Sequence, residues 1–255
     1  MVVDLSFTRK GDWERVYEPS EDTFLVEDAL ELDKKSIIES NPNLICELGC
    51  GSGYLTSCLI SIIKSDKNAN KKMPLSYMID VNIKALELSE RLLKHNHPEV
   101  SAEFIQMSLF SSFKTNNPNN YFFNIVIFNP PYVPSTNQDL INANASIGID
   151  CSWSGGTDGL FYISYFIFGD PRLVSSNDQA ALNDVIANYP VPTPCVIDIL
   201  LPKGICYLLL EERNKPKCVL ECIRKDQRYL NWDINVILER KVRFEHLYIV
   251  KFFRK

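Results

Sequence analysis

Four consecutive residues, Asn129-Pro130-Pro131-Tyr132, follow an apolar run and combine hydrogen-bond acceptors with a rigid backbone. Proline has no N–H and cannot extend a strand ladder, so the chain must leave the sheet and stiffen here. The Asn129 side-chain oxygen and the Pro130 carbonyl can both accept, and two fixed acceptors suit a planar amine with two hydrogens to donate. Tyr132 offers a ring face for stacking. A Pro-Pro turn with a satisfied asparagine is the alternative, but the position after a strand favours a ligand site.

A glycine-rich turn lies between a short apolar run at 43–49 and a helical pattern at 54–64. Glycines at such a junction let the backbone approach a ligand closely, with the helix N-terminus facing it. The pattern is neither the dinucleotide fingerprint, which needs glycine at Tyr54, nor a P-loop, which needs a following Gly-Lys-Ser/Thr. The acidic Glu47 suits a cationic or amine-bearing ligand, and a strand–helix turn without a ligand stays the alternative. The glycines are Gly49, Gly51 and Gly53.

Asp80 ends a second apolar run, and its carboxylate can accept both hydroxyls of a ribose. A plain helix cap is the alternative role, because a helical pattern follows at 83–96. Near the start of the chain, Ser20 is a good N-cap for the first helical pattern. Glu21 and Asp22 come next, in the first turn, where the helix dipole favours acidic side chains.

Strand-like and helical patterns alternate along the chain, which predicts an α/β fold with a parallel sheet and helices on both faces. The stretch 169–195 breaks this alternation with four prolines around a helix-like piece at 178–187, and we interpret it as an insertion. We expect one domain over 1–255, with a helical lead-in at 1–40. Strands are predicted at 43–49, 75–80, 102–107, 124–129, 204–211, 234–240 and 245–253, helices at 21–40, 54–64, 83–96 and 217–228, and loops at 65–74 and 115–120.

The composition is that of an ordinary globular protein, with 45% hydrophobic and 23% charged residues, which excludes a disordered or fibrous chain. The net charge of −5 does not favour nucleic acid as a partner, although residues 202–255 hold 13 Lys and Arg against 7 Asp and Glu. No apolar run reaches the ~20 residues of a membrane span, and the first residues resemble neither a signal nor a transit peptide. Eight irregularly spaced cysteines and three histidines do not favour a metal site. Reduced thiols are expected instead, so we predict a cytoplasmic, and also nuclear, location.

Four motifs that occur in order resemble the HemK-like class I S-adenosylmethionine-dependent methyltransferases, which act on planar nitrogens. They lie at 17–24, 47–53, 129–132 and 153–159. The branch that they resemble methylates the glutamine of translation release factors, and the similarity is greatest to its eukaryotic and archaeal subgroup. Bacterial and organellar members carry a helical substrate-recognition domain before the core, for which Gly49 comes too early. The resemblance covers about residues 13–165 and, more weakly, 196–255.

The resemblance implies a Rossmann-like fold with a seven-stranded, mostly parallel sheet and helices on both faces. It implies S-adenosylmethionine as cofactor and S-adenosylhomocysteine as product, with Asp80 on the ribose and Thr23 and Tyr17 over the methionine end. Family members usually carry an acidic residue for the adenine amine at the position of Ser108, which Leu109 follows here. Either Ser108 or a backbone group must substitute, or the cofactor binds more weakly. The other implied cofactor residues are Glu47, Gly49, Gly51, Gly53 and Asn129.

In the implied reaction, residues 129–132 hold a glutamine side chain of the Gly-Gly-Gln motif of a class 1 release factor for N5-methylation. A carboxamide nitrogen is a poor nucleophile, so the site must orient it in line with the methyl donor and exclude water. The acceptors also favour the positive charge that develops on nitrogen. We assign no general base, because His95 and His97 follow the second helix, away from the strand ends, and are expected at the surface.

The resemblance also implies a partner, because eukaryotic members of the subgroup form heterodimers with a small zinc-binding activator subunit. The activator pairs a strand with the sheet edge near the third strand, which is the run at 102–107 here. Phe104, Ile105 and Met107 offer apolar contact there, and exposed edge strands are natural sites for such pairing. An edge strand covered by the chain itself is the alternative.

Three other functions stay open: N6-adenine methylation of DNA, lysine methylation of a histone, and a non-catalytic scaffold. The Asn-Pro-Pro-Tyr motif also occurs in adenine-N6 methyltransferases, but those enzymes usually add a target-recognition domain, for which 169–195 is too short. A tetrahedral lysine amine does not need two planar acceptors. The intact Asn129 and glycines argue against a scaffold.

Overall fold

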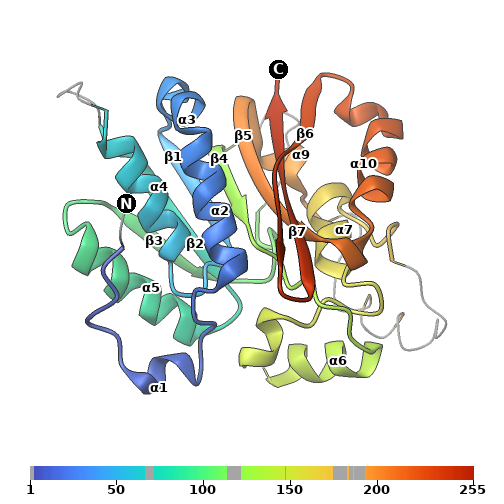
Figure 1. The fold of residues 1–255 in the computed structure, drawn as a ribbon, viewed down its shortest axis with the longest axis horizontal. Helices are drawn as coiled ribbons and strands as arrows, with labels where there is room; N and C mark the ends of the chain where they lie inside the picture. The colour runs from blue at the N-terminus through green and yellow to red at the C-terminus, as the bar shows by residue number, and fades with distance from the viewer. Residues whose placement is uncertain are drawn as a thin grey trace.

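Seven strands form one sheet in the order β3-β2-β1-β4-β5-β7-β6 in the computed structural model of the chain (Figure 1). Neighbouring strands are parallel from β3 to β5, and β7 runs antiparallel to both β5 and β6. The predicted seven-stranded, mostly parallel sheet is therefore confirmed. The strands are β1 (Leu44–Leu48), β2 (Leu75–Asp80), β3 (Ala102–Gln106), β4 (Phe123–Phe128), β5 (Leu200–Glu211), β6 (Trp232–Val242) and β7 (Glu245–Arg254). The structure describes residues 3–66, 72–113, 122–146, 148–174, 183, 186 and 193–255.

The strand order reverses beside β1, and this reversal positions a crevice. The chain runs outward from β1 to β3 and returns to β4 on the other side of β1. Leu48 therefore lies between Ile79 of β2 and Phe128 of β4. Loops that follow parallel strands diverge at such a point and leave a crevice at the carboxyl ends of the strands. The residues after β1, β2 and β4 are thus brought to one edge of the sheet.

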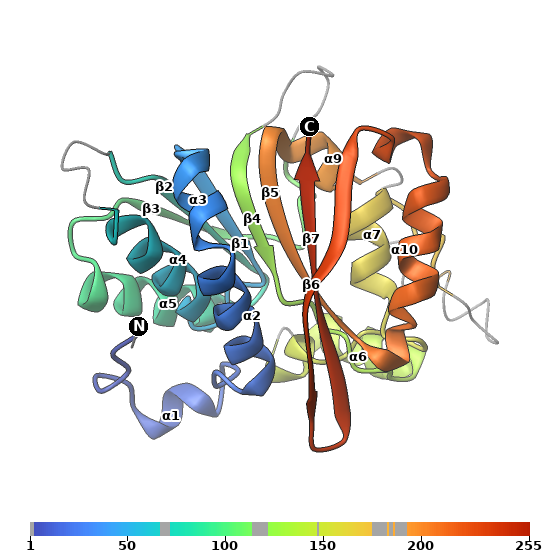
Figure 2. The ribbon, with the colours of Figure 1, turned by 45° about the horizontal axis from the view of Figure 1, so that its top comes forward.

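Helices cover both faces of the sheet, with α2, α3 and α4 on one side and α7 and α10 on the other (Figure 2). Buried side chains of α2, α4 and α7 belong to the same core cluster as the central strands, so the helices fix the sheet on both sides. The α-helices are α1 (Lys10–Trp13), α2 (Glu21–Leu32), α3 (Lys34–Ser40), α4 (Tyr54–Lys64), α5 (Ile83–Asn96), α6 (Asn137–Ser146), α7 (Phe161–Phe168), α9 (Val196–Ile199) and α10 (Pro216–Lys225), and the 3₁₀ helices are η1 (Ile149–Ser152), η2 (Glu212–Asn214) and η3 (Gln227–Tyr229).

The helix predicted over 21–40 is two helices that meet at Asp33. Asp33 leaves the helical backbone conformation, with φ −95° and ψ 12°. Its side chain accepts a hydrogen bond from the Tyr207 hydroxyl and pairs with Lys251, both from the sheet. These long-range contacts stabilise the interruption of the helix at Asp33, which the local sequence pattern does not indicate. The helix predicted over 217–228 likewise ends at Lys225, before η3.

The sequence pattern assigned no helix to α7, whose eight residues are all buried. A helix without a polar face has no hydrophobic periodicity, so it cannot be told from a buried strand by its pattern. Because it is buried on all sides, α7 is packed within the core on its face of the sheet. Its C-terminal cap is Gly169, in a left-handed conformation with φ 79°.

The two ends of the insertion predicted at 169–195 lie side by side, and its described residues Leu173, Val174 and Ile186 pack against the core. The Thr193 N–H donates to the Gly169 carbonyl at 2.9 Å, which brings the two ends of the stretch together. The helix-like piece predicted at 178–187 lies outside the described residues, except for positions 183 and 186. The assignment of 1–255 to one domain stays a prediction. Within the part of the chain that the structure describes, no helix is long and apolar enough to cross a membrane.

Candidate active site

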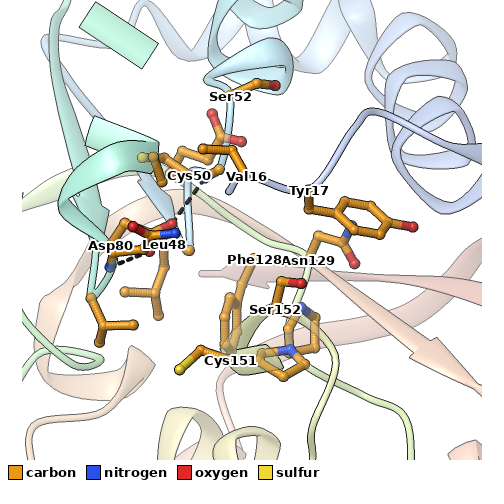
Figure 3. Close-up of a pocket in the computed structure, with 18 of the residues that line it drawn as sticks. Val16, Tyr17, Leu48, Cys50, Ser52, Asp80, Phe128, Asn129, Cys151 and Ser152 are labelled. Carbon is orange, nitrogen blue, oxygen red and sulfur yellow. Dashed lines mark hydrogen bonds between the residues drawn. The ribbon is translucent and has the colours of Figure 1, made fainter. Parts of the chain in front are cut away.

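A pocket opens at the carboxyl ends of β1, β2 and β4, where the strand order reverses. Figure 3 shows Asp80 on one side of this pocket and Tyr17 and Asn129 on the other. Of the predicted site residues, Gly53 and Tyr132 lie outside the pocket wall. Those in the wall are Tyr17, Thr23, Glu47, Gly49, Gly51, Asp80, Ser108, Leu109, Asn129, Pro130 and Pro131.

At the glycine turn, backbone atoms without side chains form part of the pocket wall. Gly49 and Gly51 have φ of 62° and 51°, which side chains rarely tolerate. A Cβ added at Gly51 would meet nothing within 4 Å, so this backbone borders open space that a ligand can occupy. The Gly51 N–H donates to Oδ2 of Asp80 at 3.0 Å, and the Asn82 N–H donates to Oδ1 at 2.8 Å. The turn and the acid are therefore held together, beside the space for a ligand.

Gly53 has a packing role in the structure. Its φ is 80°, and an added Cβ would lie 2.8 Å from Cβ of Ser89 on α5. Gly53 therefore allows α4 to start close against α5, behind the pocket wall.

Glu47 is buried where β1 enters the turn. Its Oε2 accepts from both the backbone N–H and the hydroxyl of Thr56, at 2.8 and 2.5 Å. Burial raises the pKa of Glu47 to about 8, against the opposing effect of the Thr56 hydrogen bonds. Burial also raises the pKa of Asp80. Both acids thus lie in a wall where a cationic or hydroxyl-rich ligand would compensate their desolvation.

Asn129 lies directly after β4 with its amide fixed in one orientation. Its Nδ2 donates to Oδ2 of Asp22 at 2.9 Å. Oδ1 is shielded from solvent and has no hydrogen-bond partner among the described residues. An unpartnered buried acceptor costs about 1–3 kcal/mol, so this atom is prepared for a donor that a ligand brings. The sequence pattern gave Asp22 only a helix-dipole role, although it belongs to the motif at 17–24.

The Asn-Pro-Pro-Tyr loop is clamped from behind by the motif at 153–159. A Cβ added at Gly159 would lie 2.0 Å from the Tyr132 carbonyl oxygen, and one at Gly155 would lie 2.6 Å from the Pro131 oxygen. Only glycine permits such close approach. This motif therefore supports the loop, and the resemblance alone did not indicate how.

Tyr132 is buried, and its hydroxyl donates to Oε2 of Glu245 at 3.3 Å. Burial and the nearby Asp22 carboxylate raise its pKa. Tyr132 lies outside the described pocket wall, and its hydroxyl connects the loop after β4 to Glu245 at the start of β7. The predicted stacking role stays a prediction.

Residues that the sequence did not nominate complete the pocket wall. Cys151 and Ser152 come from η1, and Tyr162 comes from α7. Leu109, a predicted site residue in the same wall, has a left-handed backbone with φ of 48°, a strained conformation for a residue with a side chain. Neither η1 nor α7 carries a motif or a periodic pattern, so no sequence signal could have placed them here.

The prediction of a surface position is wrong for His97, which is buried against α4. Its Nε2 lies 3.0 Å from the Ser57 carbonyl and its Nδ1 lies 2.9 Å from Lys64 Nζ. Burial and the Lys64 charge lower its pKa. The prediction is confirmed for His95, which is exposed and whose Nε2 lies 2.9 Å from Oδ2 of Asp4. Neither histidine is in the pocket wall.

Comparisons with known proteins agree with this geometry. The methyltransferase small domain family matches residues 31–147. The eRF1 methyltransferase catalytic subunit mtq2 of Schizosaccharomyces pombe is 31% identical over 254 residues, which are 96% of this chain and 92% of that protein. Methyltransferase HEMK2 of Homo sapiens is 26% identical, over 84% of this chain and 80% of that protein.

The fold is shared with a solved structure, the Mtq2-Trm112 complex of E. cuniculi, which is described as responsible for methylation of the eRF1 translation termination factor. The TM-score is 0.55 at 24% identity, and the match covers 94% of this chain and 99% of that one.

Proposed function

The chain belongs to the methyltransferase family of the S. pombe eRF1 methyltransferase catalytic subunit, and on this premise we propose that it methylates a glutamine side-chain amide. The substrate would be the glutamine of the Gly-Gly-Gln motif of a class 1 release factor. The observation that carries the proposal is the buried Oδ1 of Asn129, which has no hydrogen-bond partner among the residues that the structure describes; Asp22 holds the amide in place. An oriented acceptor of this kind suits the N–H of a planar amide.

S-adenosylmethionine is the cofactor that this family implies, and the pocket residues fit it. The exposed turn at Gly51 and the Asp80 carboxylate suit a ribose, and the buried Glu47 suits the cationic methionine end. Ser108 lies in the pocket wall, at the position where the family resemblance implies an acid. The cofactor, when bound, supplies an electrophilic methyl group on a sulfonium.

The chain's own residues then orient the substrate amide. Asn129 accepts one amide hydrogen through Oδ1, and the Pro130 carbonyl accepts the other. This arrangement points the nitrogen lone pair toward the methyl donor, an effect worth several kcal/mol of the barrier. The two acceptors also stabilise positive charge that develops on nitrogen.

A small activator subunit would bind the free edge of β3. β3 ends the described sheet on one side, and Phe104 and Ile105 are only partly buried there. The Met107 N–H donates to the Asp80 carbonyl of β2. Because strand residues alternate, the Phe104 N–H points away from β2. A partner strand can therefore bond to Phe104, as in β-augmentation.

Phe104→Pro tests this contact, with Phe104→Thr as its control. Proline at an outward position removes one donor but is tolerated in an edge strand, whereas threonine keeps the donor and trims the side chain. We expect co-purification of the activator with the threonine variant and its loss with the proline variant. Full retention by both variants would show that pairing does not occur at this edge.

The substrate is tested with labelled S-adenosylmethionine and the chain purified with its activator subunit. A release factor, duplex DNA and histone are offered separately, with and without the activator. We expect transfer to the release factor alone, and more of it with the activator. Transfer confined to DNA or histone would overturn the proposal in favour of adenine or lysine methylation.

We also propose a cytoplasmic or nuclear location. All eight cysteines lie in the described part of the chain, none of them forms a disulfide, and six are buried, which suits a reducing compartment. Imaging of the tagged full chain tests this location, and accumulation in a secretory compartment would contradict it.

A further inference from the structure

We propose that Asp22 is a positioning residue that determines which end of the Asn129 amide, Oδ1 or Nδ2, is turned toward the substrate. This inference rests on the proposed function, because it deepens the role of Asn129 at the same site. Asp22 contacts Asn129 through Oδ2, at 2.9 Å from Nδ2. The structure therefore connects the motif at 17–24 to the loop after β4, across 107 positions of sequence.

All the described partners of the Asp22 side chain are hydrogen-bond donors. Oδ1 accepts from the Tyr17 hydroxyl at 3.1 Å, from the Thr23 N–H at 2.8 Å and from the Thr23 hydroxyl at 3.4 Å. A carboxylate only accepts, so the group that faces Oδ2 must be the NH₂ of Asn129. The amide oxygen is then forced to the opposite side.

The two ends of an asparagine amide have nearly the same shape but opposite hydrogen-bonding character. With Oδ1 toward the substrate, Asn129 accepts an N–H. With the Asn129 amide turned over, its NH₂ hydrogens would face the N–H hydrogens of the substrate amide. Packing alone cannot separate these orientations, whereas an acceptor-only neighbour can.

Asp22 is itself held firmly enough to impose an orientation. It lies in the first turn of α2, where the helix dipole favours a negative charge. It is 5% exposed, and the next turn of α2 buries Leu25 and Val26 in the core. Because Oδ1 of Asn129 is also shielded, an incoming amide must displace part of the wall that covers it. Asp22 keeps the acceptor in place during that movement.

An exchange of the two side chains tests the proposal. Asp22→Asn keeps the acceptor for Tyr17 and Thr23 but sets an NH₂ against Asn129, which must turn over. Asn129→Asp sets two carboxylates against each other. The double variant Asp22→Asn with Asn129→Asp restores a donor on one side and acceptors on the other, with an oxygen still facing the substrate.

We expect Asp22→Asn to lower kcat by about 100-fold with little change in the cofactor Kd, in the chain purified with its activator. The double variant should recover at least about tenfold over either single variant, since a good charge-assisted hydrogen bond returns. Asp28→Asn is the control, because it makes the same acid-to-amide change on α2 at an exposed residue that lies outside the pocket wall. A kcat of Asp22→Asn within about twofold of wild type, or a double variant no better than the worse single one, would overturn the proposal.

A second readout does not depend on the substrate. In a chain labelled with ¹⁵N-asparagine, the NH₂ resonances of Asn129 are assigned by their absence in Asn129→Ser. A hydrogen bond to a carboxylate should move one of these protons downfield, and Asp22→Asn should reverse the shift. Unchanged resonances in Asp22→Asn would contradict the proposal. If the wild type fails to methylate the release factor, the proposed function fails, but the spectra still decide the role of Asp22.

Discussion

Nδ2 of Asn214 donates to the Tyr132 carbonyl oxygen at 2.9 Å and to the Asp158 carbonyl oxygen at 3.1 Å. Asn214 is fully buried in η2, after β5, and its Oδ1 accepts from the Glu211 N–H. One amide thus joins three segments behind the pocket. We infer that the geometry of the Asn-Pro-Pro-Tyr loop depends on this residue, which lies outside the pocket wall.

Asn214→Ala should lower the free energy of unfolding by about 1–3 kcal/mol, because buried carbonyls and an N–H lose their partner. It should also lower kcat by about tenfold or more, because small displacements of the loop misplace the acceptors, while the cofactor Kd stays nearly constant. Gln138→Ala is the matched control, since the hydrogen bond that the structure describes for the Gln138 side chain, to Asn142, is exposed. Similar effects of both variants on kcat would contradict the clamp.

The pKa of Glu47, raised to about 8 by burial, predicts pH-dependent cofactor binding. Below that pH the protonated acid is neutral, and above it the carboxylate attracts a cationic ligand. Affinity for S-adenosylmethionine should therefore rise between about pH 6.5 and 8.5, with a proton released on binding. Calorimetry in buffers of different ionisation enthalpy measures that release. In Glu47→Gln the affinity should rise less with pH than in the wild type, because glutamine does not titrate. Identical pH profiles of affinity in the two proteins would refute the role of Glu47.

The buried His97 predicts a loss of stability in mild acid. Its pKa is lowered in the folded protein, so the unfolded chain takes up a proton first, near about pH 6.5. Stability should therefore fall as pH decreases below about 6.5. Unfolding in denaturant at about pH 7.5 and 5.5 measures this fall, which should be smaller in His97→Gln because glutamine does not titrate. An equal fall in both proteins would contradict the prediction.

Much of the site could be predicted from the sequence because its chemistry lies beside strand ends. Gly49 and Gly51 follow β1, Asp80 ends β2 and Asn129 follows β4. Hydrophobic runs that end at glycines or prolines were therefore sufficient to locate them. Their convergence follows from parallel strands, which bring all carboxyl ends to one edge.

The remaining features depend on contacts between distant segments. Asp22 looks like an ordinary helix-start acid until the fold brings its carboxylate to Asn129, directly after β4. Asn214 and His97 carry no local signal, because their roles come from burial against other elements. The break at Asp33 likewise depends on Tyr207 and Lys251.

The most direct test is the turnover of Asn129→Ala with a release factor, measured beside its cofactor affinity. Mass spectrometry locates the methyl group, and calorimetry gives the Kd for S-adenosylmethionine in the same preparation. We predict that the wild type methylates the glutamine side-chain nitrogen of the Gly-Gly-Gln motif, and that Asn129→Ala loses at least about 100-fold in kcat with the Kd nearly unchanged. Unchanged turnover in Asn129→Ala, or a methyl group on another residue, would contradict the account.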